Sequence, residues 1–222
     1  MSEKKVRLRR QAINSLAALL FAVALSGPLP AQGTAPQPAA DKPAPWAYNL
    51  TVDGYIVPNG TGYASPVFTA DKNWHFEARY NYENLDTGSL WFGYDFNFGK
   101  KLKLALTPML GGVMGETTGI APGLELTLTY KKVQLYVANE YVFDTTKSSG
   151  SFYYSWPELT YSPVSWFRIG AVAQHTRAYH TSVNIQRGFL VGVSHKNLEF
   201  TTYVFNPDQA TPTTVLEVGY NF

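Results

Sequence analysis

Apolar and polar residues alternate along almost the whole chain from Trp46 to Phe222. The clearest alternation is in the stretch 74–83, where one set of alternate positions holds Trp74, Phe76, Ala78, Tyr80 and Tyr82 and the other holds His75, Glu77, Arg79, Asn81 and Glu83. Successive side chains of a β-strand point to opposite faces. The pattern therefore predicts strands that each have one apolar and one polar face.

Turn signals divide this pattern into eleven clear runs and one weaker run, Tyr63–Ala70, which contains Pro66. Working back from Phe222, the connections alternate between longer and short. The short ones are predicted at Asp71–Asn73, Gly99–Lys101, Lys131-Lys132, Ser162–Val164 and Lys196-Asn197. An antiparallel barrel whose two ends lie on the same side has an even number of strands. We therefore expect an all-β fold, an antiparallel transmembrane β-barrel of twelve strands, with ten strands as the alternative.

The last predicted strand, Thr213–Phe222, has apolar residues at alternate positions up to its final residue, Phe222. In a soluble fold such a strand would be an unprotected sheet edge, whereas in a barrel it pairs with the first strand. Here the chain resembles Gram-negative outer-membrane β-barrel proteins, in which a C-terminal Phe preceded by alternating apolar residues is read by the barrel-assembly machinery. The resemblance implies that this machinery and outer-membrane lipid are partners. It implies an assembly signal made of Leu216, Val218, Tyr220 and Phe222.

The N-terminal region has the features of an export signal. Five basic residues lie within the first ten positions, and the apolar run Ser15–Ser26 follows them. This run is shorter than the ~20 residues that a membrane-spanning helix requires. We predict a signal peptide over residues 1–31, a flexible periplasmic segment over 32–45 and the barrel over 46–222. An N-terminal membrane anchor is the alternative.

The composition agrees with a wall that faces lipid, since aromatic residues and charged residues each make up 15% of the chain. Soluble domains usually contain ~25% charged residues. Removal of residues 1–31 takes away five basic residues and one acidic residue, and changes the net charge from +2 to −2. This balance argues against nucleic acid as a partner. The alternative fold is a soluble antiparallel barrel or sandwich, whose apolar faces would point inward.

The polar faces of the predicted strands would line the lumen. They carry the candidate pore-lining residues Asp53, Glu77, Arg79, Asp95, Lys103, Glu125, Glu140, Glu158, Arg168, Glu199 and Glu217. A wet lumen with surplus acids would favour cations, whereas acids bound to the basic residues would plug the barrel. Large residues also have inward positions, namely Trp91, Tyr136, Tyr154, Trp156 and Tyr203. We therefore expect a narrow and partly obstructed lumen.

The hypothesis of a catalytic site rests on Ser155 and His175, two polar residues at positions where outward-facing apolar residues are expected. A turn at Ser162–Val164 would place Tyr153 opposite His175 and Ser155 on the diagonal, near enough for side chains to approach. Activation of a serine requires a base within hydrogen-bond reach, and Asn139 is a remote candidate third member. The histidines lack a recognisable metal-ligand spacing. We expect no metal site and no cofactor, and we interpret Gly111-Gly112 as a site of strand curvature.

The leading functional hypothesis is a narrow passive pore for small polar or cationic solutes, in the outer membrane of a Gram-negative bacterium with both termini periplasmic. A sealed structural or interaction barrel without transport is the first alternative. An outer-membrane lipid hydrolase is the second.

Overall fold

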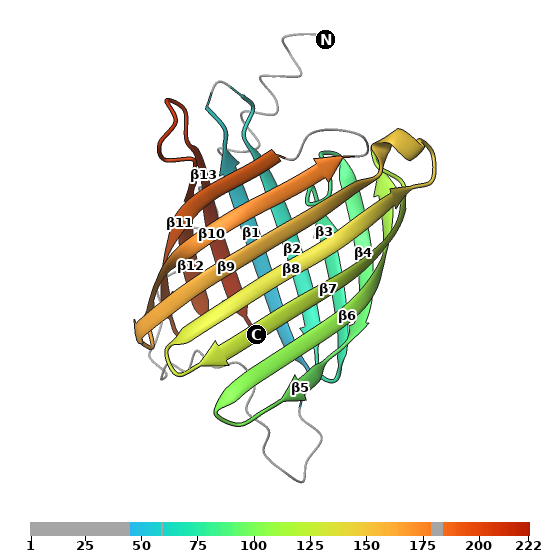
Figure 1. Cartoon of the computed structure of the whole chain (residues 1–222). Coiled ribbons are helices and arrows are strands. Elements are labelled where there is room, and N and C mark those ends of the chain that lie inside the picture. Colours follow the sequence, from blue (N-terminus) through green and yellow to red (C-terminus); the bar gives the residue numbers. More distant parts are fainter. Residues whose placement is uncertain (1–44, 59, 179–183) are drawn as a thin grey trace. The chain divides into compact units, whose positions relative to one another are not determined.

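The computed structural model describes residues 45–58, 60–178 and 184–222; the side chains of residues 148, 176–178 and 184 are not described. The predicted signal peptide 1–31, the predicted flexible segment 32–45 except its last residue, and His180 lie outside the described residues. Within the described residues, no helix is long and apolar enough to cross a membrane. Nearly all of the regular structure is β-strand (Figure 1).

The strands form a closed antiparallel barrel, in which each strand pairs with its neighbours in the chain. Their bounds are β1 Ala47–Ile56, β2 Tyr63–Asp71, β3 Trp74–Tyr80, β4 Thr87–Tyr94, β5 Phe96–Phe98, β6 Leu102–Gly115, β7 Gly119–Tyr130, β8 Val133–Asp144, β9 Phe152–Val164, β10 Phe167–Ala178, β11 Asn184–His195, β12 Leu198–Phe205 and β13 Thr213–Asn221. A short 3-10 helix, Ser148–Gly150, lies between β8 and β9.

Segments β4 and β5 form one wall strand that is interrupted at Asp95. Both segments pair with β6 in the same register, with Gly93 opposite Met109 and Phe96 opposite Leu106. That register places Tyr94 opposite Pro108, and proline has no N–H to donate to the ladder. The thirteen segments therefore make twelve wall strands, so the predicted twelve-stranded barrel is confirmed.

The pairing of β1 with β13 closes the barrel. Val52 lies opposite Val218 in this ladder, and the Phe222 N–H donates to the Tyr48 carbonyl at 2.9 Å. The weaker predicted run is a wall strand, β2, in spite of Pro66. The ten-stranded alternative, in which the last strand would pair with 74–83, is therefore wrong.

The apolar faces point outward and the polar faces point inward. On β3, Phe76 is 44% exposed, whereas the alternating Glu77 and Arg79 are only 7% and 5% exposed. Leu216, Tyr220 and Phe222 are likewise exposed on the outer face of the closing strand. A soluble barrel or sandwich would show the opposite arrangement, so that alternative fold is wrong.

The connections differ at the two ends of the barrel. We call the end with two-residue turns, such as Lys131-Lys132 and Lys196-Asn197, the turn end, and the opposite end the loop end. Strand β1 begins and strand β13 ends at the turn end. Positive φ angles at Lys131 and Lys196 allow these two tight turns.

The predicted turn at Ser162–Val164 is wrong. These residues belong to β9, and the chain turns at Ser165-Trp166. A register irregularity between Phe167 and Ile169 adds a further shift. As a result Ser155 lies directly opposite His175, and Tyr153 lies opposite Arg177 instead.

The predicted strand 74–83 is too long. Strand β3 ends at Tyr80, and residues 81–86 form the β3–β4 loop. Asn81 ends the strand because its φ is +58°. Its side chain donates to the Ala64 carbonyl at 3.0 Å and accepts from the Asp86 N–H at 2.8 Å.

Candidate functional site in the barrel lumen

Arg79 is the centre of a buried ionic cluster in the lumen. Its guanidinium lies 2.8 Å from Glu77 Oε1 and donates to Glu77 Oε2 at 2.9 Å and to Glu140 Oε2 at 2.7 Å. Glu83 Oε1 is 3.6 Å away. Because Arg79 lies on β3 and Glu140 lies on β8, this cluster links two strands that are not neighbours in the barrel. One guanidinium therefore faces three carboxylates.

The β3–β4 loop contributes two of the side chains around Arg79. The Tyr82 ring lies 4.3 Å from the Arg79 guanidinium carbon and 5.6 Å from the Tyr154 ring of β9. Glu83 accepts hydrogen bonds from Ser89 Oγ at 2.6 Å and from Trp91 Nε1 at 3.1 Å. Through Tyr82 this loop makes contact with a wall far from its own strands.

Trp91 fills the lumen beside the ionic cluster. Its ring lies 4.4 Å from the Arg79 guanidinium carbon. It covers two glycines on β6 and β7, since a Cβ at Gly111 would be 2.5 Å from the ring and one at Gly123 would be 2.8 Å from it. Gly111 thus provides space for the Trp91 ring. The sequence predicts only strand curvature at this position.

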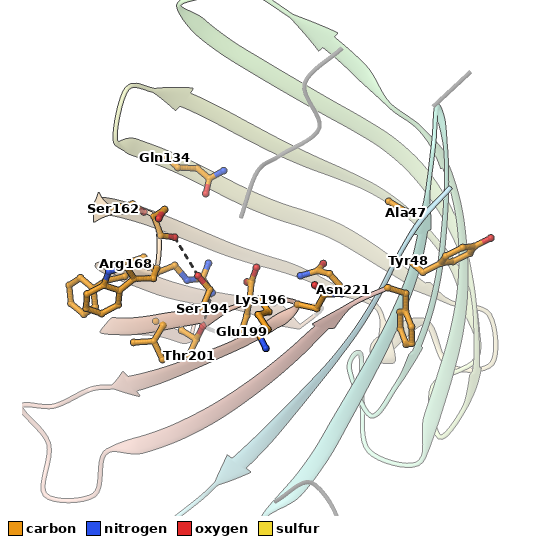
Figure 2. Close-up of a pocket in the computed structure, with 17 residues that line it drawn as sticks. Ala47, Tyr48, Gln134, Ser162, Arg168, Ser194, Lys196, Glu199, Thr201 and Asn221 are labelled. Carbon is orange, nitrogen blue, oxygen red and sulfur yellow. Dashed lines mark hydrogen bonds between the residues drawn. The ribbon is translucent and has the colours of Figure 1, made fainter. Parts of the chain in front are cut away.

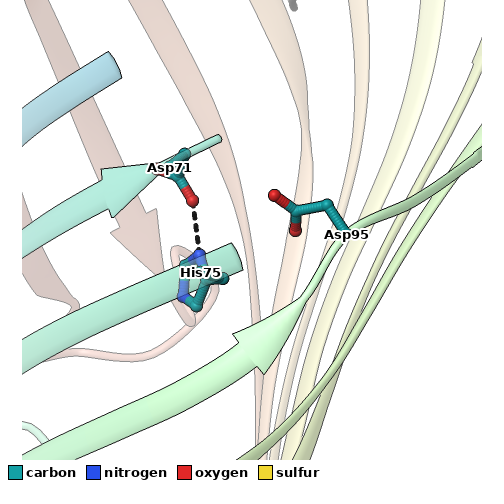
Figure 3. A group of neighbouring side chains, drawn as sticks. All are labelled: Asp71, His75 and Asp95. Carbon is teal, nitrogen blue, oxygen red and sulfur yellow. Dashed lines mark hydrogen bonds and ion pairs between the residues drawn. The ribbon is translucent and has the colours of Figure 1, made fainter. Parts of the chain in front are cut away.

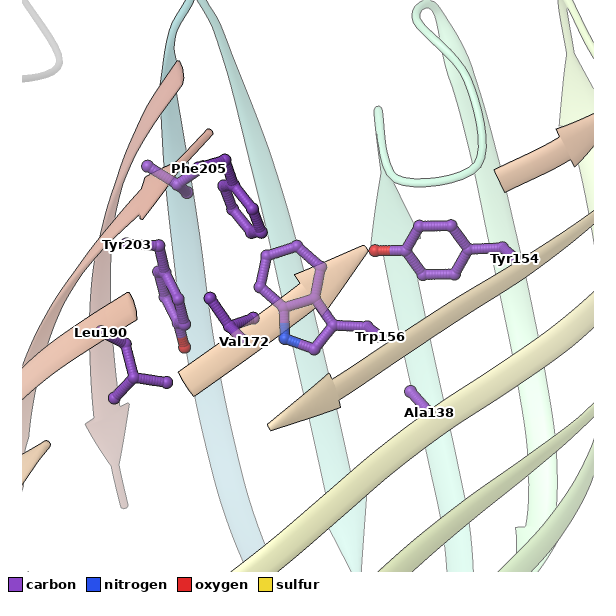
Figure 4. Close-up of a cluster of buried hydrophobic side chains, with 8 residues drawn as sticks. Ala138, Tyr154, Trp156, Val172, Leu190, Tyr203 and Phe205 are labelled. Atoms are coloured by element: carbon purple, nitrogen blue, oxygen red, sulfur yellow. The ribbon is translucent and has the colours of Figure 1, made fainter. Parts of the chain in front are cut away.

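An apolar cluster occupies another part of the lumen. It comprises Ala138, Tyr154, Trp156, Val172, Leu190, Tyr203, Phe205 and Val215, and Figure 4 shows these side chains approaching one another from several strands. The Trp156 ring meets the rings of Tyr203 and Phe205 at 5.3 and 5.2 Å, both edge to face. The predicted inward positions of Trp156 and Tyr203 are confirmed, and these contacts narrow the lumen.

A second ionic group lies on β10, β12 and β13. Arg168 donates to Thr201 Oγ1 at 2.6 Å and to Glu217 Oε1 at 3.2 Å. Tyr203 donates to the other Glu217 oxygen at 3.0 Å. Both charged side chains of this group are partly exposed, at 29% and 18%, so they contact solvent more than the Arg79 cluster does.

Arg168 also lines a cavity of about 620 Å³ at the turn end. We call this cavity the vestibule. Figure 2 shows the polar side chains around it, among them Gln134, Ser194, Glu199, Thr201 and Asn221. The vestibule is therefore an open space whose lining includes charged side chains of both signs, Arg168, Lys196 and Glu199, whereas the lumen around Arg79 and Trp156 is filled with side chains.

Several predicted lining residues have neutral hydrogen-bond donors. Glu125 accepts from Tyr136 at 2.9 Å, Glu158 from the Trp156 indole at 2.7 Å and Asp95 from Thr107 at 2.7 Å. These donors hold the carboxylates in place without balancing their charge. Acidic residues therefore remain in excess over basic ones on the inner wall.

Three other predicted lining residues differ in their surroundings. Asp53 lies opposite Ser65 on β2 and Glu217 on β13, and its Oδ1 is buried without a hydrogen-bond partner in the described part of the chain. Glu199 is half-buried in the vestibule. Lys103 is exposed beside Lys101 at the turn end. The lining role of all eleven residues stays a prediction.

Ser155 of β9 lies directly opposite His175 of β10 and is buried, and Asn139 of β8 lies opposite Ser155 on its other side. Within the described chain, no hydrogen bond joins the Ser155 hydroxyl to the His175 ring, and His175 Nε2 is buried without a partner. Asn139 instead accepts from the Tyr153 hydroxyl at 2.7 Å. Because Ser155 separates Asn139 from His175, Asn139 does not orient the imidazole as a catalytic third residue would.

Sequence reasoning missed the lumen roles of Tyr82 and Glu83 because their alternation continues that of β3. The signal available was Asn81, a residue type that tolerates positive φ. It also missed the proximity of Asp71, His75 and Asp95, whose ligand atoms all lie within 4.8 Å of one another. The sequence predicts Asp71 in a turn, and its histidines show no metal-ligand spacing, so neither signal points to this cluster.

Comparison with solved structures shows what this barrel is similar to. The KdgM porin aligns with a TM-score of 0.57 and 12% identity, over 78% of this chain and 99% of that one. The NanC porin aligns with a TM-score of 0.52 and 11% identity, over 78% and 98% of the two chains. No known protein-family pattern and no curated protein matches the sequence. The chain therefore has the fold of outer-membrane porins.

Proposed function

We propose that this protein is a narrow passive pore of the outer membrane that favours small polar or cationic solutes. The observation that carries this proposal is the excess of acidic over basic side chains on the inner wall. Arg79 faces three carboxylates, while Glu125 and Glu158 have only neutral hydrogen-bond donors. Charged side chains that line a pore set its ion preference.

The shape of the lumen supports a small size limit. The vestibule of about 620 Å³ at the turn end would hold solutes next to the constriction around Arg79, Tyr82 and Trp156, which they would have to pass in either direction. Passage through such a pore depends on size and on the fixed charge of the wall. It requires no covalent chemistry.

The charge of the lumen also indicates which solutes this pore would disfavour. A KdgM porin has been solved in complex with disordered oligogalacturonate, an acidic oligosaccharide. An acidic lumen repels such a chain, so the shared fold does not carry that ligand over to this protein. We propose instead monovalent cations and small neutral polar molecules as solutes.

The placement in the membrane follows from the same proposal. The exposed apolar wall contacts outer-membrane lipid, and the barrel-assembly machinery inserts it. The turn end, where β1 begins and β13 ends, faces the periplasm. Short turns on the periplasmic side are typical of this class of barrel.

Conductance of the pure refolded protein in a planar bilayer tests the proposal. We expect small single-channel steps, and a reversal potential in a KCl gradient that shows preference for K⁺ over Cl⁻. Glu199→Gln should reduce this preference because Glu199 lines the vestibule. Asp208→Asn is the matched control, since Asp208 lies in the β12–β13 loop and pairs with Arg187.

The sealed barrel remains a second candidate, because contacts around Arg79 and Trp156 cross the lumen. Folded protein that inserts into the bilayer without single-channel steps would establish the sealed barrel and overturn the pore. Steps that prefer Cl⁻ would overturn the proposed selectivity.

A further inference from the structure

Three potential metal ligands meet at the turn end of the barrel. Asp71 is the last residue of β2, His75 is the second residue of β3, and Asp95 lies between β4 and β5. Their ligand atoms all lie within 4.8 Å of one another. Figure 3 shows both carboxylates directed toward the imidazole ring of His75.

The backbone holds these residues together. In the β2–β3 turn the Lys72 N–H donates to the Trp74 carbonyl at 3.0 Å, and the Asp95 N–H donates to the Asn73 carbonyl at 2.8 Å. The interruption between β4 and β5 thus ties Asp95 to the turn that connects Asp71 with His75. Thr107 donates to Asp95 Oδ1 at 2.7 Å and orients its carboxylate.

A further carboxylate orients the imidazole. His75 Nε2 lies 3.3 Å from Glu77 Oε2, and Nδ1 forms a hydrogen bond with Asp71. Histidines that bind metal ions commonly donate their second ring N–H to a carboxylate, which fixes the ring and the tautomer. Glu77 is itself held by Arg79. His75 can therefore present Nδ1 to a metal ion that Asp71 and Asp95 also contact.

We propose that Asp71, His75 and Asp95 bind a divalent transition-metal ion such as Zn²⁺. One imidazole nitrogen and two carboxylate oxygens suit such ions. The ion would take the place of the proton between Asp71 and His75 Nδ1, which would be released to solvent, and water would complete the coordination of the ion. Glu77 would remain as the carboxylate that holds the imidazole. This site does not depend on whether the barrel conducts solutes.

Calorimetric titration of the refolded full-length barrel in detergent with ZnCl₂ tests the site. We expect one equivalent of Zn²⁺ to bind, with affinity at least tenfold lower in His75→Gln and in Asp95→Asn. Asp95→Asn keeps the shape of the side chain and an acceptor for Thr107, so it separates ligand loss from misfolding. Glu77→Gln should weaken binding by about 10- to 100-fold, as expected for a residue that orients a ligand.

His195→Gln is the matched control. His195 is also at the turn end but is exposed at the end of β11, outside this cluster. It should leave Zn²⁺ binding unchanged. Wild-type protein that binds no Zn²⁺, or variants at His75 and Asp95 that bind it as tightly as wild type, would show that the cluster is only a hydrogen-bonded Asp–His–Glu chain. Heat-dependent mobility in gel electrophoresis confirms that each variant is folded.

Discussion

Arg79 places a positive charge where almost no solvent reaches it, since the residue is 5% exposed. Removal of ions from water costs free energy that only close partners can offset. Glu77 and Glu140 supply these partners, with carboxylate oxygens 2.8 and 2.7 Å from the guanidinium nitrogens. Among the described residues, one oxygen each of Glu83 and Glu140 still lacks a hydrogen-bond partner. The cluster is thus held by Arg79 but keeps a surplus of negative charge.

Arg79→Gln should therefore destabilise the barrel strongly. Loss of one partner from a buried ion pair typically costs about 3–5 kcal/mol, because the remaining charges stay buried without compensation. Urea unfolding of the protein in lipid vesicles, followed by tryptophan fluorescence, measures this change. Arg187→Gln is the control, since its ion pair with Asp208 is exposed and contributes little. Equal stability of the two variants would contradict this account of the cluster.

The glycines under Trp91 allow a second test at the scale of single residues. A Cβ at Gly111 would lie 2.5 Å from the Trp91 ring, whereas one at the adjacent Gly112 would meet nothing within 4 Å. We expect Gly111→Ala to cost about 1–3 kcal/mol through overpacking. Gly112→Ala should leave the unfolding midpoint near that of wild type. The order of the two midpoints decides the matter, and a reversed order would exclude the packing role of Gly111.

At the scale of elements, the alternation of the sequence predicted the wall well and the loops poorly. The strand faces depend on side chains that alternate every two residues, and this pattern is local. The register of β9 with β10 also depends on the position of one turn. The sequence predicts this turn at Ser162–Val164, whereas the chain turns at Ser165-Trp166. The β3–β4 loop keeps an alternating pattern but folds into the lumen, where Glu83 bonds to Trp91 of the adjacent β4 and Tyr82 meets Tyr154 of the distant strand β9. Such contacts between distant segments are not visible in the sequence.

The β3–β4 loop is the element that we expect to limit conductance. Tyr82 lies between Arg79 and Tyr154, so Tyr82→Ala removes a ring that spans part of the lumen. The single-channel conductance of the Tyr82→Ala variant should exceed that of the wild-type protein. Tyr80→Ala is the matched control, since Tyr80 lies two residues earlier but is exposed on the outer face. An unchanged Tyr82→Ala conductance would place the constriction elsewhere, among the aromatic residues around Trp156.

At the scale of the whole molecule, the twelve-stranded architecture and the outward apolar face could be predicted from the sequence, because closure and alternation follow from simple rules. The degree of obstruction could not, because it depends on how Trp156, Tyr203 and Phe205 meet across the lumen. The alternating pattern predicts that each of these side chains points inward. It does not predict which side chains meet when their strands are not neighbours in the barrel.

The proposed selectivity arises from the summed charge of the inner wall, so it should depend on salt. The Debye length falls from about 10 Å at about 0.1 M salt to about 3 Å at about 1 M. The carboxylates near the vestibule, such as Glu199 and the partly exposed Glu217, should then act on ions over a shorter range. We expect the K⁺ preference, measured as reversal potential at a fixed concentration ratio, to decrease as both solutions are made more concentrated. A preference that stays constant over this range would indicate that selectivity arises only in the desolvated constriction at Arg79, where salt does not screen the charges.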